Sequence, residues 1–129
     1  MKKLLIIFAL SLLSGCSTIK EWVPSFNDPN QSAGIITVRQ SIERLDCEQP
    51  QFAQVIRIRN SVEWFELYSE SAGWRHKDVL RVIAPLKATV SDMVIRTGVQ
   101  DGSKGYCLLK KGIMQEQAAR AAQVILGRF

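Results

Sequence analysis

Apolar residues recur at helical spacing along most of this chain, and that period limits the fold to packed helices. The clearest run lies between residues 79 and 94, where the apolar positions follow the i, i+3, i+4, i+7 pattern of one helix face. Its members are Val79, Val82, Ile83, Leu86, Val90, Met93 and Val94. Asp78 is the expected cap of this helix. Pro85 lies inside the run and removes one backbone hydrogen bond, so we expect a kink or a break at Ala84 before the helix ends near Gly98.

Two further helices are predicted upstream. The first begins with Ser32 as its N-cap and ends near Cys47. Its inward residues are Ile35, Val38, Ile42 and Leu45. The second begins with Pro50 at the first helical position and stops at Gly73. Its inward residues are Phe52, Val55, Ile58, Val62 and Phe65. The stretch 54–59, QVIRIR, alternates like a strand, but its position between these helical signals favours a helix.

A fourth helix is predicted from about Tyr106 to Leu126, with Ser103 as its N-cap and Gly127 at its end. Its inward residues are Leu109, Ile113, Met114, Ala118, Ala121, Ala122 and Ile125. Four helices joined by short loops predict an all-α fold, either a small four-helix bundle or an irregular helical bundle.

The start of the chain has the pattern of a secretory signal rather than of a folded element. Met1-Lys2-Lys3 gives a short positive end, and Leu4 to Leu13 carries no charge. Ten residues span only about 15 Å as a helix, whereas the hydrocarbon core of a bilayer is about 30 Å thick. The segment is therefore too short for a stable transmembrane anchor, and we expect residues 1–15 to be removed as a signal peptide.

The residues after this apolar run, Leu13-Ser14-Gly15-Cys16, resemble the lipobox of bacterial lipoprotein precursors. The resemblance implies cleavage between Gly15 and Cys16, a thioether-linked diacylglyceryl group on Cys16 and usually an amide-linked acyl chain such as palmitate. Two or more acyl chains hold a protein stably on a membrane. Ser17 resembles the outer-membrane sorting pattern of enteric lipoproteins, so we expect an anchor in the outer membrane facing the periplasm. The inner membrane and the cell surface are the other locations considered, and an unprocessed apolar end is the alternative to lipidation.

Residues 16–31 then form a predicted lipidated tether ahead of a helical domain at 32–129. Pro24, Pro29 and the turn signal Asn27-Asp28-Pro29 interrupt any helical period. Trp22 and Phe26 are unusually apolar for a spacer. They fit either the membrane interface, where Trp is favoured, or a contact with the domain, and the sequence does not choose between the two.

The cysteine count fits an oxidising compartment. With Cys16 acylated, Cys47 and Cys107 remain as an even pair, and we predict that they form one disulfide. A bond between these two cysteines closes a loop of about 60 residues, and the entropy model predicts that it stabilises the folded chain by about 4 kcal/mol. The alternative is two independent free thiols.

The sequence carries no enzyme, metal or nucleic-acid signature. His76 is the single histidine, next to two cations at a helix start, and is expected as a solvated loop residue. Glu63, Glu66 and Glu70 share one helix face, as paired carboxylates would, but are expected as a solvated face. Losing Lys2 and Lys3 lowers the formal charge from +5 to +3, and the basic residues are scattered. We therefore expect no catalytic residue, metal, cofactor or nucleic-acid partner.

An aromatic cluster between residues 62 and 75 is the best candidate for contact with a protein. Trp64, Tyr68 and Trp74 lie among charged residues there, as binding hot spots do, although core packing accounts for the cluster as well. The leading hypothesis is a non-catalytic envelope lipoprotein that binds another envelope protein. In architecture it resembles the pilotins that bind secretins and, less closely, the outer-membrane subunits of phage spanins. An exclusion lipoprotein that blocks phage or conjugation, and a cell-wall or lipid hydrolase using Glu63, Glu66 or His76, are the rivals.

We predict that replacing Cys16 with serine abolishes acylation, because the thioether link needs the thiol. Metabolic labelling with radioactive palmitate should label the wild-type chain and leave Cys16→Ser unlabelled. Cys47→Ser is the matched control and should keep its label. Label on Cys16→Ser, or an unlabelled wild-type protein, would contradict the anchor.

Overall fold

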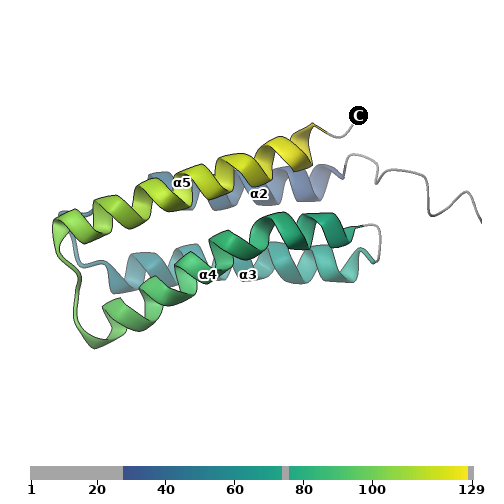
Figure 1. The fold of residues 1–129 in the computed structure, drawn as a ribbon. Helices are drawn as coiled ribbons and strands as arrows, with labels where there is room; N and C mark the ends of the chain where they lie inside the picture. Colours follow the sequence, from purple (N-terminus) through teal and green to yellow (C-terminus); the bar gives the residue numbers. More distant parts are fainter. Residues whose placement is uncertain (1–27, 74–75, 128–129) are drawn as a thin grey trace, which may run out of the picture.

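The fold is a small all-α bundle of two layers, as the sequence predicted. The computed structural model describes residues 28–73 and 76–127, and these contain no strand. The helices are α2 (Pro29–Glu43), α3 (Phe52–Ser71), α4 (Lys77–Val99) and α5 (Lys104–Leu126). Each helix packs against its neighbour in the chain, and α5 closes the ring against α2. In Figure 1, α2 and α5 form one layer above α3 and α4, and consecutive helices run in opposite directions.

The core is built from the apolar stripes of all four helices. The predicted inward residues of the first helix are all buried, and those of α4 are buried or half-buried. The buried apolar residues of α3 are Val55, Ile58, Val62 and Phe65, and those of α5 are Cys107, Met114, Ala118, Ala121, Ala122 and Ile125. These stripes converge on the axis of the bundle. Burial of apolar area is the main favourable term in its stability.

Three residues predicted to face inward are exposed instead. Leu109 is 62% exposed, Ile113 is also exposed, and Phe52 at the start of α3 is 44% exposed. The rotation of α5 about its own axis explains the exposure of Leu109 and Ile113. Cys107 points fully inward, and at 3.6 residues per turn Leu109 lies about 200° around the helix from it. The inward position of Cys107 therefore turns Leu109 toward solvent.

The first helix begins three residues earlier than predicted. Its N-cap is Asp28, whose side chain accepts hydrogen bonds from the backbone N–H groups of Asn30 (2.9 Å) and Gln31 (3.4 Å). Pro29 occupies the first helical position, where its missing N–H costs nothing. Ser32 is thus not the cap, and residues 29–31, assigned above to the tether, belong to α2. The helix also ends at Glu43 rather than near Cys47.

The two ends of α3 lie closer to the positions that the sequence predicted. Its N-cap is Gln51, one residue after Pro50, which is not itself helical. At the other end Gly73 follows the C-cap residue with φ +94°, a left-handed conformation that favours glycine. The predicted stop at Gly73 is therefore confirmed, and the QVIRIR stretch is helical.

Helix α4 differs from the prediction at its start and at its proline. His76 is the N-cap, and Asp78 lies in the first turn, where its side chain accepts from the N–H of Val79 at 2.9 Å. A negative charge there interacts favourably with the helix dipole. Pro85 does not break the helix, which continues to Val99. His76 is buried rather than solvated, with Nδ1 lacking a partner among the described residues.

A disulfide and a set of hydrogen bonds join the two loops at one end of the bundle. Cys47 and Cys107 are bonded with an S–S distance of 2.07 Å and Cα atoms 5.7 Å apart. Beside them, the carboxylate of Asp101 accepts from the N–H of Gln51 at 2.9 Å. The amide Nε2 of Gln51 in turn donates to the carbonyl of Gly102 at 2.8 Å. The α2–α3 loop is therefore held to the first turn of α5 by a covalent bond, and the start of α3 is held to the α4–α5 loop by hydrogen bonds.

Helix α5 is capped as the sequence predicted. Ser103 accepts from the N–H of Tyr106 at 3.1 Å, and Gly127 is the C-cap. None of the four described helices combines the length and the apolar character needed to cross a membrane.

Gly34 on α2 lies against the aromatic side chains of α3 and gives a test of the packing. A Cβ at this position would lie 2.8 Å from Cδ2 of the buried Phe65 ring and 3.0 Å from the Trp64 ring. We expect Gly34→Ala to destabilise the protein by about 1–2 kcal/mol, because overpacking costs about 1–3 kcal/mol and outweighs alanine's helix propensity.

Gly112→Ala is the matched control, since a Cβ there meets nothing within 4 Å. It should stabilise the protein by about 0.5–1 kcal/mol. Urea denaturation followed by circular dichroism measures both changes. Equal effects of the two substitutions would contradict the close packing of α2 on α3.

Candidate functional site

Two of the three aromatic residues predicted for partner contact, Trp64 and Tyr68, form a stacked pair on α3, which we call the aromatic platform. Trp64 and Tyr68 lie four residues apart and stack with ring centroids 5.5 Å apart and planes 11° from parallel. Trp64 is 54% exposed, although it is a large aromatic residue. Because the neighbouring ring supports the indole, the exposed face keeps one orientation.

Polar contacts of the same region lock this platform to the start of α2. The Tyr68 hydroxyl donates to Oδ2 of Asp28 at 2.9 Å and accepts from Nδ2 of Asn30 at 3.1 Å. At the next residue of each helix, Nε2 of the buried Gln31 donates to Oγ of the buried Ser69 at 3.2 Å. Tyr68 therefore has a structural role, and its side chain is half-buried. The sequence suggested the aromatic pair but not these contacts, which join residues about 40 positions apart.

Two hollows lie along the face between α2 and α3, and we call them together the α2–α3 groove. The first has a volume of about 210 Å³ and is lined by Ala33, Gly34, Thr37, Ser61 and Trp64. The second, of about 130 Å³, is lined by Ser41, Arg44, Leu45, Gln54 and Arg57. Between them, the hydroxyls of Ser41 and Ser61 lie 3.0 Å apart across the helices. The groove thus has an aromatic end at Trp64 and a cationic end at the arginines.

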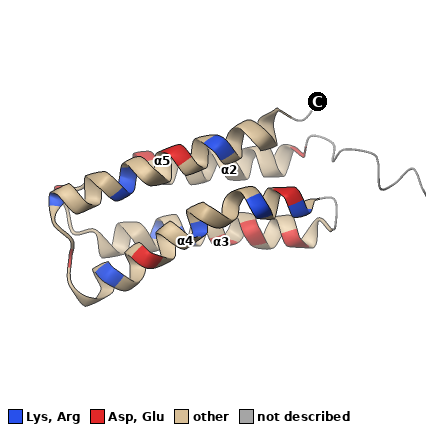
Figure 2. Ribbon diagram, in the orientation of Figure 1, with Lys and Arg blue, Asp and Glu red and all other residues tan. Residues whose placement is uncertain are grey.

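The cationic end has no compensating acid. No Asp or Glu lines either hollow of the groove. Within residues 28–73 and 76–127, neither Arg44 nor Arg57 forms an ion pair, and Arg57 donates only to the carbonyl of Ala53 at 3.4 Å. Some other charges on the helices are paired, such as Lys87 with Glu66 at 2.6 Å and Lys110 with Asp92 at 2.7 Å. Figure 2 shows both signs of charge distributed over all four helices.

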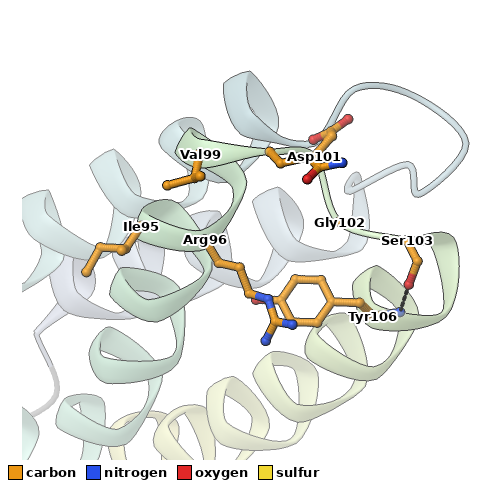
Figure 3. A pocket seen from close by; sticks show the side chains of 8 residues that line it. Ile95, Arg96, Val99, Asp101, Gly102, Ser103 and Tyr106 are labelled. Atoms are coloured by element: carbon orange, nitrogen blue, oxygen red, sulfur yellow. Dashed lines mark hydrogen bonds between the residues drawn. The ribbon is translucent and has the colours of Figure 1, made fainter.

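A larger and more open cleft of about 680 Å³ lies at the turn between α4 and α5. Its residues include Arg96 at the end of α4 and Tyr106 at the start of α5. The guanidinium of Arg96 lies over the Tyr106 ring, 4.5 Å from its centroid, while Ile95 and Val99 point away from that ring (Figure 3). Tyr106 was predicted only as a helix start, and the distant Arg96 gave no signal of the stack.

The polar groups of this cleft are largely occupied within the protein. Asp101 is bonded to Gln51, Ser103 caps α5, and Arg96 stacks on Tyr106. The hydroxyl of Tyr106 is buried and has no partner among the described residues. The exposed apolar residues here, Ile95 and Val99, lie outside the stack. The cleft therefore offers a shallow surface beside a cation–π pair.

The side chains considered for catalysis do not converge on a cavity. Glu63 pairs with Arg59 at 3.5 Å, and the hydrogen bond from Lys87 to Glu66 raises the pKa of that lysine. His76, these two glutamates and Glu70 line neither the hollows of the α2–α3 groove nor the cleft between α4 and α5. In the part of the chain that the structure describes, no three His, Cys, Asp or Glu residues group as a metal site would require.

Several predicted site residues lie outside the described residues. Gly15, Cys16 and the third aromatic candidate, Trp74, fall there, so cleavage, acylation and the role of Trp74 stay predictions. Of the predicted contact residues, the structure brings Trp64 and Tyr68 together on one face. The arginines of the groove were not predicted as site residues.

Taken together, the described residues define a small helical bundle with a preformed surface groove and a separate open cleft. Neither a protein-family model, nor a curated protein, nor a solved structure matches the chain. The functional argument therefore depends on the residues themselves.

Proposed function

We propose that this protein is a small, non-catalytic envelope lipoprotein that binds another envelope protein through its α2–α3 face. The anchor is the acylated Cys16 inferred from the lipobox, in the outer membrane and facing the periplasm. The observation that supports binding most directly is Trp64, which is half-exposed yet held rigidly by Tyr68 beside a hollow. Rigid, amphipathic aromatic residues beside pockets are the usual anchors of protein interfaces.

The position of the platform supports contact near the membrane. Tyr68 is bonded to Asp28, the first described residue, so the aromatic end of the groove lies where the tether joins the domain. Twelve residues separate Cys16 from Asp28, which limits the reach of the tether to about 40 Å at 3.3 Å per residue. A partner in or near the same membrane is therefore within reach of this face.

Among the narrower possibilities, the compact bundle favours a role like that of a pilotin. The resemblance is in architecture and disulfide use: four helices in a small domain, closed by the Cys47–Cys107 bond. Outer-membrane spanin subunits are often shorter and rich in proline, whereas the described helices contain only Pro29 and Pro85. The partner in this version is a segment of a secretin or of a similar outer-membrane assembly.

A photo-crosslinking experiment in intact cells tests this proposal. A benzoylphenylalanine in place of Thr37, an exposed residue that lines the hollow beside Trp64, should form one discrete adduct with another envelope protein when the full-length, lipidated chain is irradiated. The same amino acid at Gln123, on an exposed face of α5, is the matched control and should form none. The binding proposal fails if position 37 gives no adduct, or if both positions give the same products.

A further inference from the structure

The two ends of the α2–α3 groove differ in chemistry, and this difference specifies what fits there. We infer that the groove binds an acidic amphipathic helix of the partner protein, with an apolar side chain against Trp64 and a carboxylate against Arg44 and Arg57. The inference rests on the proposed function, because it names the part of the partner that the α2–α3 face recognises. Three observations support the inference: the size of the hollows, the two arginines without an ion pair, and the distance between the two ends of the groove.

The aromatic end fits a single apolar side chain. Its hollow of about 210 Å³ is smaller than the 300–1,000 Å³ or so that small-molecule sites usually occupy. The exposed ring of Trp64 forms one wall, and Gly34 lies against the Trp64 and Phe65 rings, where a larger residue would not fit. An apolar anchor inserted here would bury part of the exposed indole, which is a favourable exchange.

The cationic end fits a carboxylate. Arg44, the C-cap residue of α2, and Arg57 on α3 are both exposed and line the same hollow of about 130 Å³. No acidic residue lines either hollow of the groove, and neither arginine forms an ion pair within residues 28–73 and 76–127. Guanidinium groups bind carboxylates through paired hydrogen bonds. The guanidinium groups of Arg44 and Arg57 line the same hollow, so both can bind one carboxylate there.

The distance between the two ends sets the spacing in the partner. Arg57 and Trp64 are seven residues apart on α3, which is about 10.5 Å at 1.5 Å per residue. A partner helix running along the groove therefore places its anchor and its carboxylate two turns apart, at positions i and i+7. Both anchors then lie on one face, as in other helix-in-groove complexes.

A helix suits this groove better than an extended strand. The groove is walled by two helices whose backbone groups are already hydrogen-bonded, and the described residues contain no strand edge to which a strand could add. An extended segment would leave its backbone N–H and C=O groups without protein partners, whereas a helix satisfies them internally. Helices also pack at interaxial distances of about 8–10 Å where facing side chains are small, as at Ala33, Thr37 and Ser41.

The test combines charge reversal with the crosslink from position 37, which leaves Trp64 in place, in full-length, lipidated protein in intact cells. Arg44→Glu/Arg57→Glu should reduce the adduct at least about tenfold, because each reversed charge meets the carboxylate of the partner. Lys77→Glu/Arg81→Glu is the matched control, with the same change in net charge at the start of α4. It should change the yield less than twofold. Arg44→Gln/Arg57→Gln removes the attraction without adding repulsion and should give an intermediate loss.

Mass spectrometry of the adduct should map the crosslink to a predicted helix of another protein with an Asp or Glu seven residues from the crosslinked position. Changing that acid to lysine should restore the adduct of Arg44→Glu/Arg57→Glu. Unchanged circular dichroism of each variant establishes that the fold is intact.

The possible failures separate the two proposals. An adduct with another protein that survives charge reversal, or that maps to a basic segment, overturns the acidic helix while binding by the α2–α3 face stands. An adduct with residues 16–27 of the same chain, or with a second copy, assigns the groove another occupant and also overturns it. The absence of any adduct overturns both.

Discussion

The bond between Cys47 and Cys107 is the constraint on which the arrangement of the helices depends. It joins the loop after α2 to the first turn of α5, across 60 residues of sequence. Since it points Cys107 into the core, it sets the rotation of α5 and thereby the inward stripe that runs from Met114 to Ile125. The ring of four helices is closed at this end by a covalent bond, where a domain of this size would otherwise depend on side-chain packing alone.

The opposite end of the bundle is held by polar contacts. Asp28 caps α2 and accepts the hydrogen bond of Tyr68, while Gln31 and Ser69 bond to each other in the interior. These contacts fix the start of α2 against the end of α3. A surface whose side chains are already ordered loses less entropy when a partner binds, so the cost of association falls. The same residues that stabilise the bundle therefore prepare its α2–α3 face for recognition.

The sequence predicted the helices and the disulfide because both follow from local or compositional signals. Apolar spacing located the stripes of α2 and α4, and Ser103 and Gly73 marked helix ends through their own chemistry. The start of α2 was placed late because Asn27-Asp28-Pro29 has the composition of a turn, yet Asp28 and Pro29 are also suited to an N-cap and a first helical position. Leu109 was placed in the core because spacing alone does not fix the rotation of a helix.

The candidate site was only partly predictable for a related reason. Trp64 and Tyr68 are neighbours on one helix, so their four-residue spacing was visible in the sequence. Arg44 follows the last residue of α2 and Arg57 lies on α3, and only the packing of α2 on α3 brings them to one hollow. His76 seemed solvated from its charged neighbours, but the start of α4 buries it. Tertiary packing thus decides which charges are left uncompensated, and this information is absent from any single segment.

The account as a whole requires a chain that is exported, acylated and oxidised. Peptide mapping by mass spectrometry of the protein purified from envelopes without reducing agent tests these three features in one sample. The account predicts a Cys47–Cys107 linked peptide pair together with an acylated amino terminus at Cys16. Free thiols at both downstream cysteines in a chain that still begins at Met1 would contradict it.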